Sequence, residues 1–305
     1  MSSRLASMVS MGILASLVVL GPVSVSAQSG SGYSVDADWA KLPEGMEWNG
    51  SVTWITPDGH GNVLVLVRAA PYFRLFNREG RFVRAWGTES EFDSPHSVTF
   101  DSEGFIWATD SAGHVVHKYS SEGEVLMTIG ERGEAGDDTS RDRFNQVNHL
   151  AFGPDGDIYV SDGYVNSRIV HFTKEGEFVR IIGGAKGSEP GELLVPHGVA
   201  IDSAGRILVN DSDNQRVSVF AKDGSFVETW PFPSRGGIVV AADDTVYISD
   251  VNAGAVNIVR DGELIESVPV DARAHGLGVD IDGTIYVSDS RGRKAMRITR
   301  VGSND

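Results

Sequence analysis

The sequence predicts an all-β protein, a six-bladed β-propeller whose ring is closed by an N-terminal strand. Three observations support this fold: one apolar pattern recurs six times, turn-forming residues separate its copies, and no helical period follows the first 27 residues. The pattern is clearest at Arg206–Asp211, a β-rich run that ends in an acidic residue. Successive copies lie 39 to 52 residues apart, a repeat length typical of propeller blades. The other copies are Asn62–Val67, Phe105–Asp110, Asp157–Asp162, Thr245–Asp250 and Thr284–Asp289.

The first 27 residues are typical of a secretory signal peptide. Arg4 precedes a mostly apolar stretch from Met8 to Leu20, and small residues follow up to Ala27. This order of basic, apolar and small residues indicates a cleaved export signal and not a membrane anchor. We therefore expect cleavage after Ala27, a secreted or periplasmic location, and a single propeller domain over residues 28–305.

Each blade is expected to contain four strands separated by short turns. The Asp-Gly pair at Asp223 is a typical hairpin turn. In the fourth blade the expected strands are His197–Asp202, Arg206–Asp211, Arg216–Phe220 and Phe226–Trp230. Fourth strands recur in other blades as Phe82–Gly87, Val125–Gly130, Phe178–Gly183 and Leu264–Pro269.

The sixth blade is one strand short in the order of the chain. After Thr284–Asp289 only one further run, Ala295–Thr299, precedes the end of the sequence. The segment Tyr33–Trp39 comes before the first blade and has no partner of its own. We expect it to complete the sixth blade, because an unpaired strand edge between the first and last blades would be a liability.

Composition excludes several kinds of protein. The chain has no cysteine, which removes disulfides, thiolate metal sites and lipid attachment at a cysteine. Its net charge of −16 argues against nucleic acid and anionic membrane surfaces as partners. No later apolar run is long enough to span a membrane. We expect a monomer.

Histidine occupies one repeat position in alternate blades. Counting back five residues from the position of Asp202 gives His96, His197 and His275 in blades two, four and six. The corresponding residues in blades one, three and five are Ser51, Asn148 and Gly236. In a closed ring the three imidazoles would face one another across the central channel. Three histidines with an open fourth position suit a catalytic zinc ion. The alternative is that these side chains only pack or form hydrogen bonds.

Two loop residues beside the histidines are candidates for substrate chemistry. Arg68 follows the second strand of blade one and is the only basic residue at its repeat position. A guanidinium group suits a carboxylate, although an arginine here could equally pair with a nearby acid. Tyr164 lies two residues past a strand end, where a cation would lower its pKa and favour proton transfer. The inserts Glu131–Phe144 and Ala185–Leu194 should crowd the same face.

Other charged and aromatic side chains are interpreted as structural. Arg168 and Arg216 occupy matching positions before β-branched residues, which indicates a structural bond between blades. The remaining histidines break the repeat position, so they are interpreted as ordinary surface or packing residues. They are His60, His114, His117, His149 and His171.

The segment from Phe144 to Val199, with its Ser-Asp-Gly-Tyr-Val-Asn-Ser-Arg run at Ser161–Arg168, resembles a known family. It is similar to peptidyl-α-hydroxyglycine α-amidating lyase, the lyase domain of peptidylglycine α-amidating enzymes, and all blades look like NHL repeats. The resemblance implies a six-bladed propeller with a channel zinc held by three histidines. They match His96, His197 and His275. The family's tyrosine near the metal matches Tyr164, and its substrate arginine matches Arg68.

The chain departs from that family at several positions. A second family arginine falls on Ser212, and the family's disulfide cysteine falls on Val165. A family aspartate that helps to hold a structural calcium is replaced by Gly276, so the resemblance does not carry calcium over to this chain. Arg273 lies two residues before His275, and alternate residues of a strand share a face. We expect Arg273 to take the place of the lost arginine; the alternative is a loop arginine that points to solvent.

The resemblance implies a secreted, metal-dependent lyase that cleaves the N–Cα bond of a carbinolamide such as a peptidyl-α-hydroxyglycine. Its products would be an amide and glyoxylate, and its partner a small-molecule or peptide substrate with a carboxylate. Zinc would lower the pKa of the substrate hydroxyl, Tyr164 would help to move its proton, and Arg68 would hold the carboxylate. Two alternatives stay open: a non-enzymatic NHL-type propeller that binds a peptide, glycan or protein, and a metal-dependent hydrolase.

Overall fold

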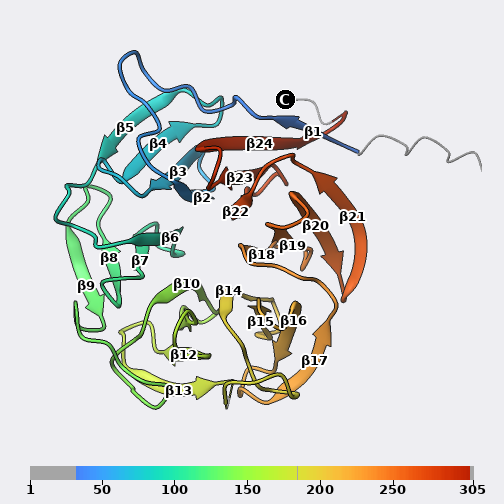
Figure 1. Ribbon diagram of the computed structural model, residues 1–305. Helices are drawn as coiled ribbons and strands as arrows, with labels where there is room; N and C mark the ends of the chain where they lie inside the picture. The colour runs from blue at the N-terminus through green and yellow to red at the C-terminus, as the bar shows by residue number, and fades with distance from the viewer. Residues whose placement is uncertain (1–31, 184, 303–305) are drawn as a thin grey trace, which may run out of the picture. The chain divides into compact units, whose positions relative to one another are not determined.

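The computed structural model describes residues 32–183 and 185–302, and every regular element in these ranges is a β-strand. The strands form six antiparallel four-stranded sheets around a central axis, as Figure 1 shows. The all-β, six-bladed prediction is therefore confirmed. The predicted signal peptide, residues 1–27, lies outside the described residues. Within the described ranges, no helix is long and apolar enough to cross a membrane.

Blades one to three follow the order of the chain. Blade one contains β2 (Val52–Pro57), β3 (Asn62–Val67), β4 (Phe73–Asn77) and β5 (Phe82–Trp86). Blade two contains β6 (Pro95–Phe100), β7 (Ile106–Asp110), β8 (Val115–Tyr119) and β9 (Val125–Ile129). Blade three contains β10 (Val147–Phe152), β11 (Ile158–Asp162), β12 (Arg168–Phe172) and β13 (Phe178–Ile182).

Blades four and five repeat this order, and blade six borrows a strand. Blade four contains β14 (Pro196–Ile201), β15 (Ile207–Asp211), β16 (Arg216–Phe220) and β17 (Phe226–Trp230). Blade five contains β18 (Ile238–Val240), β19 (Val246–Asp250), β20 (Ala255–Arg260) and β21 (Glu263–Pro269). Blade six contains β22 (Ala274–Val279), β23 (Ile285–Asp289), β24 (Lys294–Arg300) and β1 (Tyr33–Asp36).

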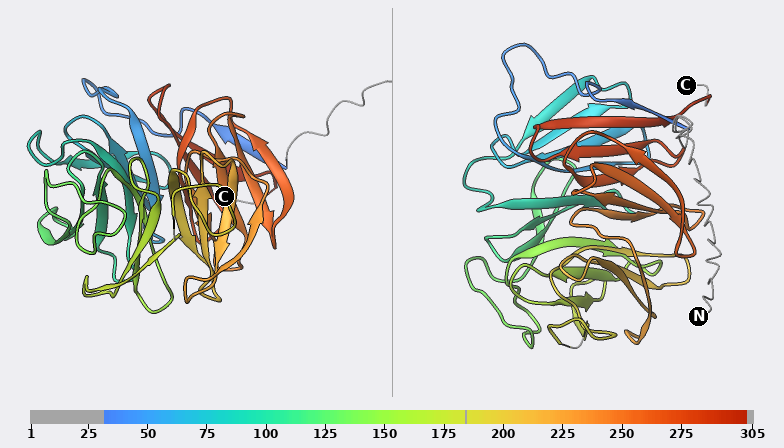
Figure 2. Two further views of the ribbon diagram at one scale, coloured as in Figure 1. Left: turned by 60° about the horizontal axis from the view of Figure 1, so that its bottom comes forward. Right: turned by 45° about the vertical axis from the view of Figure 1, so that its right-hand side comes forward.

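The first strand of each blade lies nearest the axis, and the core lies between the blades. Strand β2 contacts both β6 and β22, so blade one packs against blade two and blade six. Buried apolar side chains form six clusters, each shared by two neighbouring blades. The second strands are buried along their whole length, as apolar runs between two sheets should be. Figure 2 shows the blades from two further sides.

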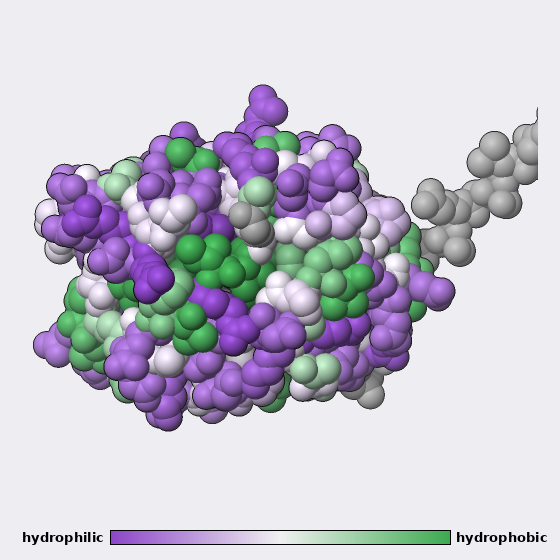
Figure 3. All heavy atoms as spheres, turned by 90° about the horizontal axis from the view of Figure 1, so that it is seen from below, coloured by the Kyte–Doolittle hydropathy of each residue, from purple (hydrophilic) through white to green (hydrophobic). Residues whose placement is uncertain are grey.

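The outermost strands face water and are less apolar. Side chains on these strands alternate or are exposed, and apolar residues such as Val227 and Leu264 are about half exposed. Figure 3 shows the outer wall near β13 and β17 as mainly hydrophilic, with apolar patches between the polar side chains. The wall therefore contributes little to the core, and the inner strands carry most of the packing.

The N-terminal segment lies at the junction of the first and last blades. Strand β1 pairs antiparallel with β24, from Tyr33 opposite Arg300 to Asp36 opposite Arg297. The strand is shorter than predicted and ends at Asp36, because the Asp36 carboxylate accepts the Asp38 N–H in a tight turn. Trp39 is buried against Tyr286 of blade six, with ring centroids 5.0 Å apart, and against Phe76 of blade one, at 5.8 Å. Its indole therefore bridges the two blades.

The two inserts are held by the arginines that were interpreted as structural. Arg168 bonds to Asp162 and to the carbonyls of Ser140 and Arg143 in the insert between blades two and three. Arg216 likewise bonds to Asp211 and to carbonyls of the second insert. Each arginine thus ties a long loop to its own blade, so its role is structural, but the predicted bond between blades is replaced by a bond between a blade and the insert that precedes it.

Candidate functional site

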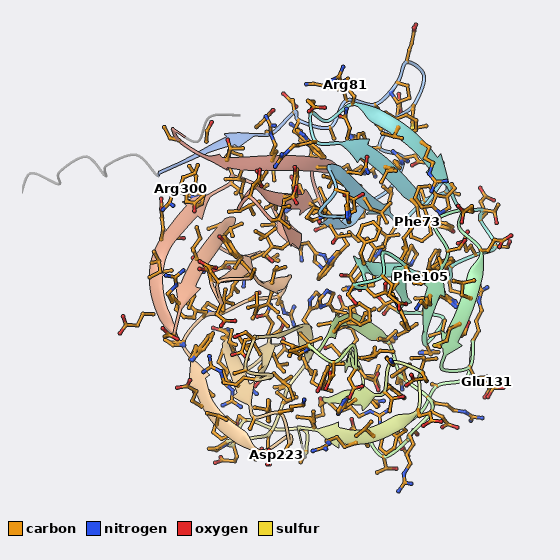
Figure 4. The ribbon with its side chains drawn as sticks, turned by 180° about the vertical axis from the view of Figure 1, so that it is seen from behind. Phe73, Arg81, Phe105, Glu131, Asp223 and Arg300 are labelled. Carbon is orange, nitrogen blue, oxygen red and sulfur yellow. The ribbon has the colours of Figure 1, made fainter. Side chains whose placement is uncertain are left out.

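Three histidines meet at the axis from alternate blades. Each is the second residue of an innermost strand, His96 of β6, His197 of β14 and His275 of β22. One ring nitrogen of each imidazole lies within 4.8 Å of those of the other two. Figure 4 shows side chains reaching from the inner strands toward the axis, whereas the labelled Arg81 and Glu131 lie on the outer rim. The juxtaposition predicted from the repeat is present in the folded chain.

A β-bulge directs each of these side chains inward. In blade two the register moves from Pro95 opposite Asp110 to Val98 opposite Ala108, so His96 lies in the irregular step. The same step occurs beside His197 and His275. A bulge adds twist and re-aims a side chain, which is why bulges recur next to functional sites.

The Nδ1 atom of each imidazole is anchored to a backbone carbonyl of the next blade. The distance from His96 Nδ1 to Asn148 O is 2.8 Å, and that from His275 Nδ1 to Thr53 O is 2.8 Å. His197 Nδ1 lies 3.2 Å from Gly236 O. Because a carbonyl only accepts, each Nδ1 carries the proton and each Nε2 offers a lone pair to the channel.

The pairing of β2 with β3 corrects the predicted counterpart of the histidines in blade one. Val52 pairs with Val67 and Ile55 with Val65, which aligns Thr53, and not Ser51, with the three histidines. The prediction started the count in blade one from the wrong residue: Asp58, which follows β2, corresponds to Asp202, and five residues before it is Thr53. Thr53 therefore supplies the carbonyl that Asn148 and Gly236 supply in the other odd blades.

The three imidazoles are neutral at ordinary pH. Burial, reinforced by the neighbouring imidazoles, holds the pKa of His96 and of His197 well below their usual range. Burial lowers the pKa of His275 to about 4. Three neutral rings with lone pairs turned to one point, each fixed through its second nitrogen to a carbonyl, are the donor set and orientation that zinc requires. The residues present therefore fit the metal that was expected.

Tyr164 lies directly over this cluster. Its hydroxyl is 2.9 Å from His96 Nε2 and 3.3 Å from His197 Nε2. Burial raises the pKa of Tyr164, and the charges of Arg68, Arg235 and Arg273 oppose that rise. The hydroxyl can donate to only one of the two lone pairs. A cation bound to both Nε2 atoms would occupy their lone pairs, and the Tyr164 hydroxyl would then be free to bond to a substrate.

The loop that carries Tyr164 depends on Gly163. A Cβ atom at Gly163 would lie 1.7 Å from the carbonyl oxygen of Pro196 in blade four. The same carbonyl accepts hydrogen bonds from Asn148 and Ser161 of blade three. Only glycine lets the loop cross so close to the neighbouring blade, and this crossing brings Tyr164 above His197.

Trp54 and His149 lie beneath the cluster. The Trp54 indole is 5.8 Å from the ring of His275, 6.1 Å from that of His96 and 6.4 Å from that of His197. It also stacks on His149 at 4.5 Å, and both line a cavity of about 390 Å³ at the opposite end of the channel. The cluster is therefore bounded by an indole on one side. His149 was interpreted as an ordinary packing residue, and it packs here beside the site.

The other side of the cluster opens into a cavity of about 370 Å³. Arg68 lines it and donates from Nε to the carbonyl of Pro95, the residue before His96. Arg273 belongs to the loop before β22, as the alternative interpretation held, but it lines the same cavity. The full lining is Ser51, Thr53, Arg68, Tyr164, Arg273, His275, Ser290 and Arg291. Sequence reasoning missed Arg291 and Trp54.

Two departures from the resembled family have structural explanations. Ser212 is buried and does not line the cavity, so that position contributes no charge to it. A Cβ at Gly276 would lie 2.4 Å from the Cα of Trp54 and 2.7 Å from Thr53 O. An aspartate side chain has no room there, because β22 and β2 approach too closely.

Comparison with known proteins is consistent with this fold and site. The NHL repeat family model matches residues 193–220, which include His197. Human NHL repeat-containing protein 3 is 27% identical over 300 residues, covering 89% of this chain and 85% of that protein. A probable peptidyl-alpha-hydroxyglycine alpha-amidating lyase of Caenorhabditis elegans is 28% identical, covering 73% of this chain and 69% of that protein.

Larger proteins and more distant structures also match. Rat peptidylglycine alpha-amidating monooxygenase is 31% identical over 68% of this chain, a match that spans 24% of that protein. The structure of virginiamycin B lyase from Staphylococcus aureus aligns with a TM-score of 0.64 at 14% identity, covering 88% of this chain and 99% of that one. That structural likeness supports the fold alone. The chain is an NHL-repeat β-propeller whose homologues include peptidyl-alpha-hydroxyglycine alpha-amidating lyases and NHL repeat-containing protein 3.

Proposed function

We propose that this chain is an exported, metal-dependent lyase that cleaves the N–Cα bond of a carbinolamide such as a peptidyl-α-hydroxyglycine. The observation that carries the proposal is the convergence of three neutral, backbone-anchored imidazoles beside Tyr164 and an arginine-lined cavity. His96, His197 and His275 would hold the metal. Relatives named as amidating lyases support the same class of reaction.

The reaction moves one proton and breaks one bond. The hydroxyl proton leaves the carbinol oxygen, its electron pair forms the carbonyl of glyoxylate, and the N–Cα pair stays on the nitrogen. The nitrogen takes up a proton, so the products are an amide and glyoxylate. Zinc, when bound, supplies a Lewis acid that favours loss of the hydroxyl proton. No redox cofactor is needed.

The residues of the chain have separate tasks in this scheme. Arg68, fixed by its bond to Pro95 O, holds the substrate carboxylate with its two remaining nitrogens. Arg273 adds a second positive charge at the same cavity. The Tyr164 hydroxyl, placed over the imidazoles, carries the proton from oxygen to the departing nitrogen.

The test combines metal analysis with product analysis. Mature protein, residues 28–305, should contain about one equivalent of divalent metal after exposure to zinc and should release glyoxylate from a peptidyl-α-hydroxyglycine. His197→Ala should lose most of the metal and the activity, because two imidazoles hold zinc poorly. His60→Ala, at an exposed turn, is the matched control and should retain both. Protein that takes up no zinc, or that releases no glyoxylate when loaded, contradicts the proposal.

A second candidate is a propeller that binds a partner without catalysis. It is favoured by human NHL repeat-containing protein 3, which aligns over more of this chain than the amidating lyases do. Under this alternative, zinc-loaded protein would release no glyoxylate, and His197→Ala would leave partner binding unchanged.

A further inference from the structure

The cavity beside the histidines carries more positive charge than one carboxylate requires. Three of its eight lining side chains are arginines, Arg68, Arg273 and Arg291, and none is acidic. No residue in the described ranges forms an ion pair within 4.0 Å with any of the three. Ten other arginines in the described ranges pair with a carboxylate, so the gathering of three unpaired arginines at one cavity distinguishes this part of the molecule.

The chain holds the arginine loops of blades one and six together. The Ser51 carbonyl accepts the backbone N–H of Arg68, and the Ser51 hydroxyl donates to the carbonyl of Ser290. Ser290 in turn donates its N–H to the carbonyl of Arg273. The backbones that carry all three arginines are therefore joined through one short network. Their guanidinium groups are gathered at one opening by the fold.

Asp271 and Asp289 line a neighbouring hollow that Arg273 and Arg291 also line, but neither carboxylate lies within 4.0 Å of a guanidinium nitrogen of these arginines. The Asp289 carboxylate instead accepts the backbone N–H groups of Arg291 and Gly292. Arg235, on blade five, is paired with Asp213. Arg68, Arg273 and Arg291 remain as donors that face the cavity. Two guanidinium groups are enough to hold one carboxylate, so the third points to a second anionic group.

We propose that the cavity selects a dianion: a substrate whose acyl part carries a second anionic group besides the carboxylate next to the reacting carbon. In this arrangement Arg68 and Arg273 hold the carboxylate nearest the histidines, and Arg291 receives the second anion. The inference rests on the proposed function for the identity of the first carboxylate. It adds the substrate class, an α-hydroxyglycine amide of an acidic residue or of a dicarboxylic acyl group.

The test compares two probes of the same size that differ by one charge, succinate and its monoamide succinamate. Calorimetric titration of zinc-loaded protein should show succinate binding about tenfold more tightly, which corresponds to about 1.4 kcal/mol. The preference should shrink as salt is raised, because partly exposed charges are screened. Arg291→Gln should reduce the preference to less than about twofold.

Arg293→Gln is the matched control, because it removes the same charge two residues away and Arg293 lines a different hollow. It should keep the preference for succinate. Equal binding of the two probes by the unmodified protein overturns the inference, and so does a preference that survives Arg291→Gln or is lost equally in Arg293→Gln. Glyoxylate release is measured in parallel. Normal release with equal binding overturns only the dianion preference, whereas absent release overturns the proposed lyase whatever the probes do.

Discussion

At the scale of single residues, the proton on each Nδ1 decides what the channel can bind. The carbonyls of Asn148, Gly236 and Thr53 accept these protons. Each ring is therefore held in the Nδ1–H tautomer, and its lone pair is on Nε2. Tyr164 is the one hydroxyl among the described residues that bonds to these nitrogens. A cation on these lone pairs would displace the Tyr164 hydroxyl from the imidazoles.

Tyr164→Phe separates these two tasks. The variant should keep its zinc, since phenylalanine removes a competitor and no ligand, while glyoxylate release should fall about 10²- to 10⁴-fold, the range for a proton-transfer group. Zinc content and turnover measured on one preparation check this. Loss of zinc together with activity would show that the phenol acts as a ligand, and unchanged turnover would remove it from the proton transfer.

Residue positions were predictable where the repeat could be counted and unpredictable where strands approach from distant parts of the chain. The three histidines follow from the count, because each occupies the same place before a second strand that ends in Asp. Ser51 was placed wrongly, since the copy of the pattern in blade one ends in Val67 and not in Asp, which obscures that the count must start from Asp58 and give Thr53. Trp54 and Arg291 have no repeat signal, and only the meeting of blades one and six shows their position beside the site.

At the scale of elements, the loop after β11 is shaped by how closely it passes the next blade. Its position is set by Gly163 against Pro196 O, and the insert before β10 is fixed to the same blade through Arg168. Strand boundaries agree with the predicted runs to within about a residue in blade four, because hydrophobic period and turn residues act locally. The path of the loop is not local, so the sequence pattern could place Tyr164 on the correct face without its contacts.

Gly163→Ala tests the role of this loop. The added methyl would overlap Pro196 O, so the loop must move and should carry the Tyr164 hydroxyl away from the imidazoles. We expect a loss of stability of roughly 1–3 kcal/mol, as for other overpacked sites, and reduced turnover. Gly32→Ala is the control, because its Cβ would meet only ordinary contacts at 3.6 Å. Chemical denaturation and turnover of both variants decide the point, and equal behaviour would show that the crossing is not needed.

At the scale of the whole molecule, stability is a property of neighbouring blades and not of single sheets. Each apolar cluster is shared between two blades, so no blade can bury its faces alone. The junction of blades six and one has the additional contribution of Trp39, whose Nε1 donates to Arg78 O at 2.8 Å. The segment before blade one is therefore part of the core.

Deleting residues 33–39 should weaken the whole ring. The deletion removes the outer strand of blade six and the buried indole of Trp39, and loss of a buried tryptophan side chain alone costs roughly 3–5 kcal/mol. We expect the melting temperature to fall by about 10 °C or more in a chain of this size. Deleting residues 1–27 should leave it unchanged. Equal melting temperatures for the two truncations would show that the segment does not stabilise the ring.

Acid should destabilise the metal-free protein. The pKa of His275 is lowered to about 4 and that of His149 to about 3, both by burial, so the unfolded chain binds protons that the folded chain excludes. Stability should therefore fall as the pH is lowered from about 6.5 toward 4, by about 1.4 kcal/mol per pH unit for each such histidine. His149→Gln, which keeps an acceptor for the Val199 N–H, should flatten this dependence. Denaturation of both proteins in chelator at pH 7 and pH 4.5 measures the loss of stability. An equal loss in the variant would show that His149 does not contribute to it.

The ring has two periodicities, because each hydrogen bond from an imidazole runs to a carbonyl of the following blade. Packing repeats with every blade, but the ligand pattern repeats with every second one, so even blades carry the imidazoles and odd blades supply the carbonyls that orient them. Arg68 and Tyr164 also come from odd blades. The loops after β3 and β11 supply side chains to the site, whereas the carbonyls that orient the imidazoles lie in or just before the first strands of the odd blades. Side chains in these loops can therefore change while the backbone carbonyls keep each imidazole in its orientation.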